Sequence, residues 1–354
     1  MQIRQGGLNL SVRIPTTTGG YNTMPAISVL MPAYNTPENY LREAIESVLS
    51  QTFSDFELFV IDDCSPLPVV ADVVRTYNDP RLKYLKTEQN GGAAATRNFG
   101  IAQTSGRYLA FIDADDAALP ERFARQFEYL ESHPETGVLG TGYKVIPADR
   151  ITINNRSDRQ LLLETIFVGS QFCQSSMMLR KSVLTDNNIF YRKDRIPAED
   201  YALWMDLAGK TVFHILPEVL TLYRFHPQNL STLQADKQYM QTCDIIFQKW
   251  QSFTPRPLDQ EIITKFLSRA TMSTEEIATL GKNISDLLSG VQKQNPELYP
   301  GALALLCRQW KRLVKAAPDR KMLSALLKEP IKKTLRPGCF FNLKHHIRTL
   351  FLPQ

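Results

Sequence analysis

The chain has 354 residues, of which 43% are apolar and 22% are charged, and both fractions are close to the averages for folded soluble proteins. These values argue against a disordered or fibrous chain, and the length predicts about two domains. The net charge of +5 is too small to indicate nucleic-acid binding by itself.

Cysteine spacing and hydropathy predict the setting of the protein. The five cysteines are scattered and form no C-x-x-C pair, so neither a disulfide framework nor a structural zinc site is predicted. This favours a reducing, cytoplasmic location. No run of 18 apolar residues and no signal-peptide core is present, so we expect a protein that does not span a membrane.

The first half of the chain alternates between predicted strands and helices. Residues 1–25, rich in Thr, Gly and Asn, are interpreted as a leader. Buried apolar runs predict strands, and helical spacing of apolar residues predicts the segments between them. The strands are expected at 26–31, 56–63, 81–86 and 107–116, and the helices at 37–52, 69–77, 91–105 and 119–133. This order is typical of an α/β fold with a mostly parallel, Rossmann-like sheet.

The second half has a different pattern. Residues 137–225 are mixed, with short strands predicted at "SSMMLR", "VFHIL" and "LTLYRF" around a helix at "EDYALWMDLA". Helical segments separated by Pro, Gly and Asn then continue to the end of the chain. The predicted organisation is therefore a leader (1–25), an α/β domain (26–235) and a carboxyl-terminal helical domain (236–354).

Carboxylates follow the predicted strands, most densely in "YLAFIDADD". Side chains at the carboxyl ends of parallel strands lie where open α/β sheets bind ligands. A D-x-D at such a place can hold a divalent cation that neutralises a departing phosphate. The alternative is that these aspartates are solvated and cap the next helix.

Five blocks in this order resemble glycosyltransferase family 2, whose members have the nucleotide-sugar-binding GT-A fold. The blocks are "ISVLMPAYN", "SVLSQTFSDFELFVIDDCS", "NGGAAATRNFGIAQTSGRYLAFIDADD", "PAEDYALWMDLA" and "YRFHPQNLS", which together span about residues 26–231. The last two blocks are most similar to the branch that builds lipooligosaccharide and other surface glycans. The resemblance implies an inverting transfer of an N-acetylhexosamine or a hexose from a UDP-sugar to a glycan hydroxyl, with Mn²⁺ or Mg²⁺.

The resemblance also implies roles for individual residues on the donor side. Pro32 and Tyr34 would lie at the nucleotide base, Asp63 would accept a hydrogen bond from uracil, and Arg97 would contact the donor. Asp115 would hold the metal, with Asp113 on the ribose or a metal-bound water. The alternatives are core packing for Tyr34 and a helix cap for Asp63.

Further roles concern the reaction and the acceptor. By resemblance Asp200 is the base that takes a proton from the acceptor hydroxyl. Glu199 either orients the acceptor or charges the first turn of its helix. His226 either completes the metal shell or is a loop residue, and Trp204 either stacks on an acceptor sugar or lies in the core. The family branch tends to carry Asn-Pro and His where this chain has "GSQFCQSS", so its donor or acceptor preference is expected to differ.

The carboxyl-terminal tail is basic and carries an apolar stripe at Phe340, Leu343, Ile347, Leu350 and Phe351. Such a helix suits an anionic membrane surface, which predicts peripheral contact with the inner face of the cytoplasmic membrane. The alternative is a helix docked on its own domain or in a homodimer.

Two other functions stay open: sugar transfer to a polyprenyl phosphate, and a nucleotide-sugar-binding protein without catalysis. A nucleic-acid partner is not expected, because the basic residues gather in the tail without interleaved aromatic side chains.

Overall fold

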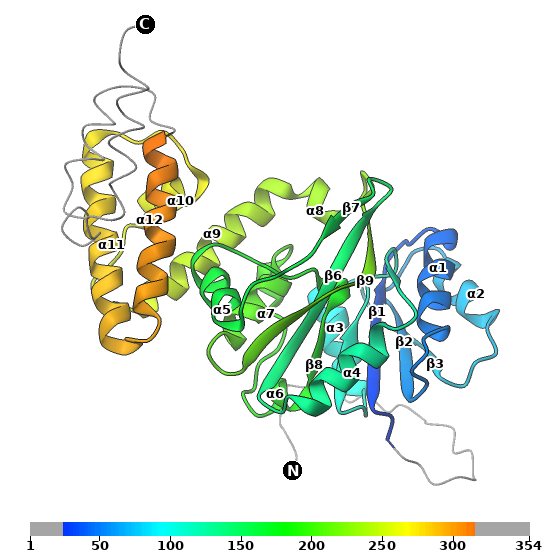
Figure 1. The fold of residues 1–354 in the computed structure, drawn as a ribbon. Helices are drawn as coiled ribbons and strands as arrows, with labels where there is room; N and C mark the ends of the chain where they lie inside the picture. The colour runs from blue at the N-terminus through cyan, green and yellow to red at the C-terminus, as the bar shows by residue number, and fades with distance from the viewer. Residues whose placement is uncertain (1–23, 316–354) are drawn as a thin grey trace, which may run out of the picture.

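The computed structural model describes residues 24–315. The apolar stripe predicted in the tail and nearly all of the predicted leader lie outside these residues. Within them, nine strands form one sheet in the order β3-β2-β1-β4-β8-β6-β9-β5, with β7 paired to β6 (Figure 1). The predicted α/β class with a mostly parallel sheet at its core is confirmed.

The parallel half of the sheet is built from the strand and helix alternation that the sequence predicts. Its elements are β1 (Ile27–Ala33), α1 (Glu38–Leu49), β2 (Phe56–Asp62), α2 (Val69–Arg75), β3 (Leu82–Lys86), α3 (Gly92–Gln103) and β4 (Tyr108–Phe111). β1 pairs in parallel with both β2 and β4. Every residue of β2 is buried, as expected for a strand covered on both faces.

The other half of the sheet contains antiparallel pairs. Its elements are β5 (Ala117–Ala118), α4 (Arg122–Ser132), β6 (Thr136–Ile146), β7 (Arg150–Thr152), α5 (Asp158–Phe167), a 3₁₀ turn η1 (Gln174–Ser176), β8 (Met178–Arg180), α6 (Lys181–Thr185), a second 3₁₀ turn η2 (Lys193–Arg195), α7 (Glu199–Leu207) and β9 (Val212–Arg224). β8 runs antiparallel to β4 and to β6, whereas β6 and β9 are parallel. The two short strands expected at 212–216 and 220–225 are one continuous strand, β9.

β6 was not predicted, and its glycines explain why. Glycine weakens the strand signal of a sequence. In the structure a Cβ at Gly137 would lie 2.1 Å from the Thr211 Oγ1, and one at Gly142 would lie 3.0 Å from the Glu218 carbonyl oxygen. The glycines are therefore needed because neighbouring segments approach this strand closely.

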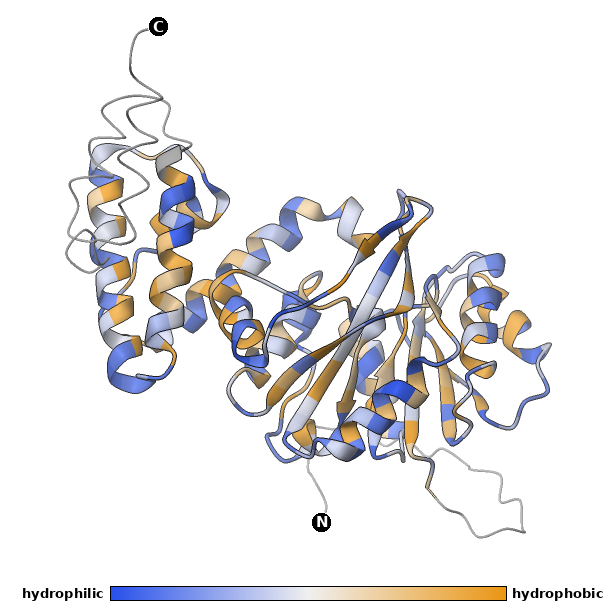
Figure 2. Cartoon of the chain, in the orientation of Figure 1, coloured by the Kyte–Doolittle hydropathy of each residue, from blue (hydrophilic) through white to orange (hydrophobic). Residues whose placement is uncertain are grey.

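The chain continues as helices after β9: α8 (Leu230–Leu233), α9 (Ala235–Ser252), α10 (Gln260–Ser268), α11 (Thr274–Gln294) and α12 (Tyr299–Lys315). Asp259 caps α10, and Ser273 with Glu276 forms a capping box on α11. The α10, α11 and α12 helices form a separate layer with alternating apolar and polar bands, as expected for amphipathic helices (Figure 2).

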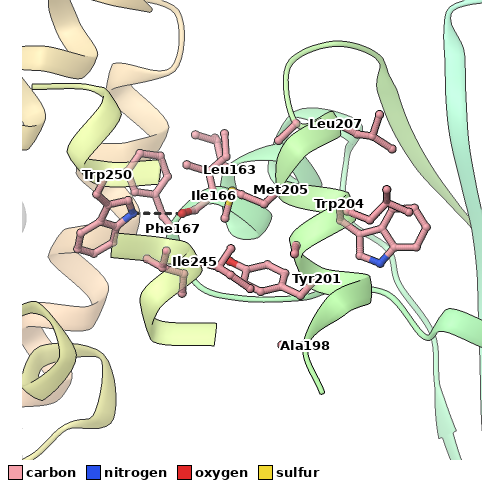
Figure 3. Packing of buried hydrophobic residues seen from close by; sticks show 14 of the residues in the cluster. Leu163, Ile166, Phe167, Ala198, Tyr201, Trp204, Met205, Leu207, Ile245 and Trp250 are labelled. Atoms are coloured by element: carbon pink, nitrogen blue, oxygen red, sulfur yellow. Dashed lines mark hydrogen bonds between the residues drawn. The ribbon is translucent and has the colours of Figure 1, made fainter. Parts of the chain in front are cut away.

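Two apolar clusters cover the two faces of the sheet. Alternate residues of β1 contribute to opposite faces, with Val29 in one cluster and Leu30 in the other. The cluster around Leu30 extends through α5, α7 and α9 to α12. Trp250 of α9 donates a hydrogen bond to the Ile166 carbonyl oxygen, 3.1 Å away (Figure 3). The division into domains at residue 235 thus stays a prediction, because the helices share this core with the sheet.

No helix within residues 24–315 combines the length and the apolar character that crossing a bilayer requires.

Candidate active site

A cavity of about 1120 Å³ lies at the carboxyl ends of β1, β2 and β4 and extends to the starts of α3 and α7 and to the segment around α8. This is the edge of the sheet at which open α/β folds bind ligands. Nine of the ten predicted site residues line it: Pro32, Tyr34, Asp63, Arg97, Asp113, Asp115, Glu199, Asp200 and His226. Residues from widely separated motifs therefore meet at one cavity.

Asp63 joins the end of β2 to the start of α3. Its Oδ1 accepts hydrogen bonds from the Gly91 N–H at 3.0 Å and from the Thr87 hydroxyl at 3.1 Å, and its Oδ2 accepts from the Gly92 N–H at 2.8 Å. The carboxylate thus caps α3, the alternative considered above. Oδ1 already accepts two bonds, whereas Oδ2 accepts one and can accept a second, so the base-reading role stays a prediction. Tyr34, half exposed at the cavity wall, is accessible for stacking.

The three acidic residues of "DADD" have different partners. The Asp113 N–H donates to the Ser175 hydroxyl at 3.0 Å, which fixes its backbone while its side chain remains about a third exposed. Asp116 is almost wholly buried and accepts from the Arg224 N–H at 2.7 Å, so it braces β9. Burial, and then the charge of Asp113, raises the pKa of Asp115. Such a cluster of buried negative charge favours a cation.

Arg97 connects the acidic loop to α7. Its guanidinium donates to the Asp113 Oδ1 at 2.7 Å and to the Glu199 Oε1 at 3.0 Å, and its side chain is 5% exposed. Burial opposes the charged form, but Asp113, Tyr191 and Glu199 outweigh it and hold the pKa of Arg97 above its ordinary value. The guanidinium therefore fixes the relative position of the Asp113 and Glu199 carboxylates.

Asp200 follows Glu199 in the first turn of α7 and also lines the cavity. Burial, and then the charge of Glu199, raises the pKa of Asp200 to about 7, although the Tyr201 N–H and Arg97 oppose the shift. A carboxylate with a pKa near neutrality is suited to proton transfer at physiological pH.

His226 contacts the acidic loop from the other side. Its Nε2 lies 2.9 Å from the Asp115 Oδ2, and its ring stacks on Tyr40 with centroids 5.6 Å apart. Its Nδ1 is buried without a hydrogen-bond partner. Arg224 lies beside it and donates from Nε to the Asp115 carbonyl oxygen at 2.9 Å.

These donors suit part of a metal shell. Asp115 and His226 present a carboxylate oxygen and an imidazole nitrogen side by side, which hard and borderline divalent cations accept. No set of three or more His, Cys, Asp or Glu side chains is arranged to hold a metal within the part of the chain that the structure describes. A cation at this position would therefore need oxygens from a ligand or from water.

The tenth prediction, that Trp204 stacks on an acceptor sugar, is wrong. Its side chain is 0% exposed and packs edge-on against Phe172, with ring centroids 5.7 Å apart. Figure 3 shows it inside the apolar cluster of α7. It does not line the cavity, so it presents no face to an acceptor sugar. The interpretation of Trp204 as a core residue holds instead.

Several residues of the cavity had no role predicted from the sequence. Tyr143 and Tyr223 come from β6 and β9 and face each other edge to face, with ring centroids 6.3 Å apart. Gln174 and Ser175 come from the "GSQFCQSS" segment that departs from the family branch. That departure was the one available signal for this part of the wall.

Comparison with known proteins identifies the family. The sequence profile described as glycosyl transferase family 2 matches residues 28–189. An uncharacterized glycosyltransferase of Methanocaldococcus jannaschii is 30% identical over 224 residues, which are 61% of this chain and 77% of the relative. An uncharacterized glycosyltransferase of Haemophilus influenzae is 27% identical over 263 residues, which are 69% of this chain and 75% of the relative.

Solved structures share the fold. S. aureus TarS 1–349 in complex with UDP-GlcNAc superposes with a TM-score of 0.52 at 18% identity, and the match covers 91% of each chain. The ordered motifs, the GT-A-type sheet and the similarity to these relatives agree. The chain belongs to glycosyltransferase family 2.

Proposed function

We propose that this glycosyltransferase moves an N-acetylhexosamine or a hexose from a UDP-sugar to a hydroxyl of a surface-glycan acceptor, with inversion at the anomeric carbon. The observation that carries the proposal is the single cavity in which Arg97 joins Asp113 to Glu199 beside Asp200. The cavity is large enough for a nucleotide-sugar and part of an acceptor. TarS, which has the same fold, was solved with UDP-GlcNAc, and this supports a UDP-sugar as the donor class.

The donor side is proposed to consist of Pro32, Tyr34, Asp63, Arg97, Asp113 and Asp115. Tyr34 is accessible for stacking on the base, since aromatic faces bind bases in this way. Asp115 and His226 would hold Mn²⁺ or Mg²⁺, with Asp113 close by. When bound, such a cation neutralises the charge that develops on the departing diphosphate.

Asp200 is proposed as the general base. Its carboxylate takes the proton of the acceptor hydroxyl while that oxygen bonds to the anomeric carbon of the donor sugar. The bond from this carbon to the diphosphate breaks in the same displacement, and UDP leaves. Glu199, held by Arg97, would orient the acceptor, and Tyr143 and Tyr223 would offer it an aromatic wall in place of Trp204.

The decisive experiment is a calorimetric titration of UDP into the purified protein with Mn²⁺ and with EDTA. We expect metal-dependent binding that is lost in Asp115→Ala and retained in Asp236→Ala, which changes an exposed carboxylate of α9. UDP release from a panel of UDP-sugars would then identify the donor. Absence of UDP binding in the wild type under both conditions would contradict the proposed donor.

Peripheral membrane contact and a homodimer remain proposals that depend on the tail outside the described residues. Deletion of residues 331–354 should abolish binding to anionic vesicles if the tail is the anchor. Unchanged vesicle binding would exclude this role.

A further inference from the structure

Arg122 of α4 is a buried guanidinium for which the mechanism above has no use. It is 0% exposed, and no carboxylate of residues 24–315 lies within ion-pair distance of it. Burial lowers the pKa of Arg122 to about 9, although the nearby Cys173 and Asp116 oppose this shift. An unpaired buried cation destabilises a fold, so its presence requires a compensating interaction.

Hydrogen bonds to backbone carbonyl oxygens and to Gln126 compensate the charge through Nε and Nη2, while Nη1 is buried without a partner. Arg122 donates from Nη2 to the carbonyl oxygens of Phe111 at 2.9 Å and Met177 at 3.1 Å, and from Nε to the Gln126 Oε1 at 3.1 Å. Gln126, one helical turn later and equally buried, donates to the carbonyl oxygens of Leu139 at 3.1 Å and Ser176 at 2.9 Å. We call Arg122 and Gln126 the α4 clamp.

The α4 clamp lies where strands of the sheet separate. β4 and β8 pair only between residues 108–110 and 178–180. Beyond this point one chain continues into the acidic loop, residues 113–116, and the other forms the turn at residues 174–177. At this end of the pairing the Phe111 N–H still donates to the Met177 carbonyl oxygen at 3.0 Å. The clamp adds a second bond to Met177 and binds the carbonyl oxygens of Phe111 and Ser176, where the loss of a partner is costly in a buried place.

Both segments held by the clamp lead directly into the cavity. Asp113 comes two residues after Phe111, and Ser175, which accepts the Asp113 N–H, comes two residues before Met177. A shift of either segment would move the Asp113 and Asp115 carboxylates. Displacements of about 1 Å in a site are sufficient to lower activity by about 100-fold.

We propose that Arg122 and Gln126 are positioning residues of the donor site, which hold the acidic loop and the 174–177 turn in register for a nucleoside diphosphate. The inference rests on the proposed function for the identity of the ligand. The contacts of the clamp are independent of that function.

The test compares Arg122→Met with Arg180→Met, a matched control. Arg180 also donates to backbone carbonyl groups, those of Thr136 at 2.9 Å, His133 at 3.1 Å and Leu130. It lies on β8 opposite Tyr108, at the end of β4 away from the acidic loop, and does not line the cavity. Both variants therefore lose comparable hydrogen bonds, but only one of them loses bonds next to the site.

We expect both variants to melt at lower temperature than the wild type. Well below both melting temperatures, the Kd for UDP with Mn²⁺ should rise at least about tenfold in Arg122→Met, which is about 1.4 kcal/mol, and less than about twofold in Arg180→Met. Arg122→Lys should recover only part of the affinity, because an ammonium lacks the planar fork. Equal Kd values in the two methionine variants would overturn the proposal.

A second measurement needs no nucleotide. Amide hydrogen exchange in residues 111–116 and 174–177 should accelerate in Arg122→Met and remain at the wild-type rate in Arg180→Met. If Arg122→Met does not fold, Gln126→Leu is compared with Arg180→Met instead. This variant removes the other half of the clamp and retains the Arg122 guanidinium. Unchanged exchange in these segments would refute the clamp, whereas a wild type that binds no UDP would refute the proposed function only.

Discussion

Replacement of Asp200 by asparagine should remove activity and at the same time stabilise the protein. The substitution preserves the shape of the side chain but removes its charge and its ability to take a proton. Burial and the neighbouring Glu199 raise the pKa of Asp200 from 3.8 to about 7. The ionised carboxylate is therefore unfavourable in the folded state, and its amide replacement is not.

The size of the effect follows from the pKa. One pH unit corresponds to about 1.36 kcal/mol, so the difference from 3.8 to about 7 sets an upper bound of roughly 4 kcal/mol. Asp200 lines an open cavity, where water screens its charge, so we expect about 2 kcal/mol. The folded protein binds this proton more tightly than the unfolded chain does. The wild type therefore begins to lose free energy of unfolding as pH rises above about 4, and the loss is complete above about 7.

The assay is urea denaturation of the wild type and Asp200→Asn at pH 4.5, 6 and 8. The variant should be more stable at pH 8, and the difference should shrink to about 1 kcal/mol at pH 4.5, where the unfolded chain has already lost most of this proton. Asp236→Asn, an exposed carboxylate in the first turn of α9, is the control and should match the wild type. A stability difference that is absent at pH 8, or that is the same at every pH, would refute the reasoning.

The same pKa predicts kinetic behaviour. UDP release by the wild type should fall about tenfold for each pH unit below about 7, because the base is then protonated. Asp200→Asn should lower the rate by about 100-fold to 10,000-fold. Wild-type activity that is flat from pH 5 to 8 would exclude Asp200 as the base.

Three further substitutions test other parts of the site. Arg97→Met leaves Asp113 and Glu199 without their shared cation and should lower the free energy of unfolding by about 3–5 kcal/mol in urea titrations, with only partial recovery in Arg97→Lys; full stability in Arg97→Met would contradict the ion-pair geometry. Tyr34→Ala should weaken UDP binding about tenfold in calorimetry without a change in melting temperature, because the half-exposed ring contributes stacking rather than core packing. Trp204→Phe should lower stability by about 1–2 kcal/mol while the kinetic constants for donor and acceptor stay unchanged, and a selective rise in the acceptor KM would restore the sugar-stacking role.

Much of the fold was predictable because local pattern and tertiary environment agree in the parallel half. β1 and β2 are apolar runs interrupted by few polar residues, among them Ser28 and Glu57, and they alternate with helices whose apolar residues recur at helical spacing. β6 was missed because its glycines weaken the strand pattern. These glycines are required by the close approach of Thr211 and Glu218, which are distant in the sequence. β9 was divided at Pro217, although the strand continues through a register shift beside Gly142.

The candidate site was predictable as a set of positions but not as a set of contacts. Residues at the ends of parallel strands gather at one edge of the sheet, and this accounts for Pro32, Tyr34, Asp63, Asp113 and Asp115. The other four residues at the cavity were identified by the family resemblance alone. The pairing of side chains within the site could not be predicted from the sequence. For example, the hydrogen bond from Arg97 to Glu199 joins residues 102 positions apart. Trp204 was ambiguous because α7 is buried on nearly all sides, so helical spacing alone did not tell whether this side chain faces the cavity or the core.

The partners of Asp115 have a consequence for the synthesis of the protein. Its side chain contacts His226, which lies 111 positions later in the chain. Its carbonyl oxygen accepts a hydrogen bond from Arg224, which lies 109 positions later. A growing chain emerges from the ribosome with its amino terminus first, so the strands from β1 to β4 are available to fold long before β9 exists. During that interval Asp115 and Asp116 lack the later residues that hold their side chains, whereas Asp113 already has Arg97. A nascent or truncated chain that ends before residue 224 is thus expected to build a nucleotide-sized crevice without a competent site, and activity would begin only when translation has passed α8.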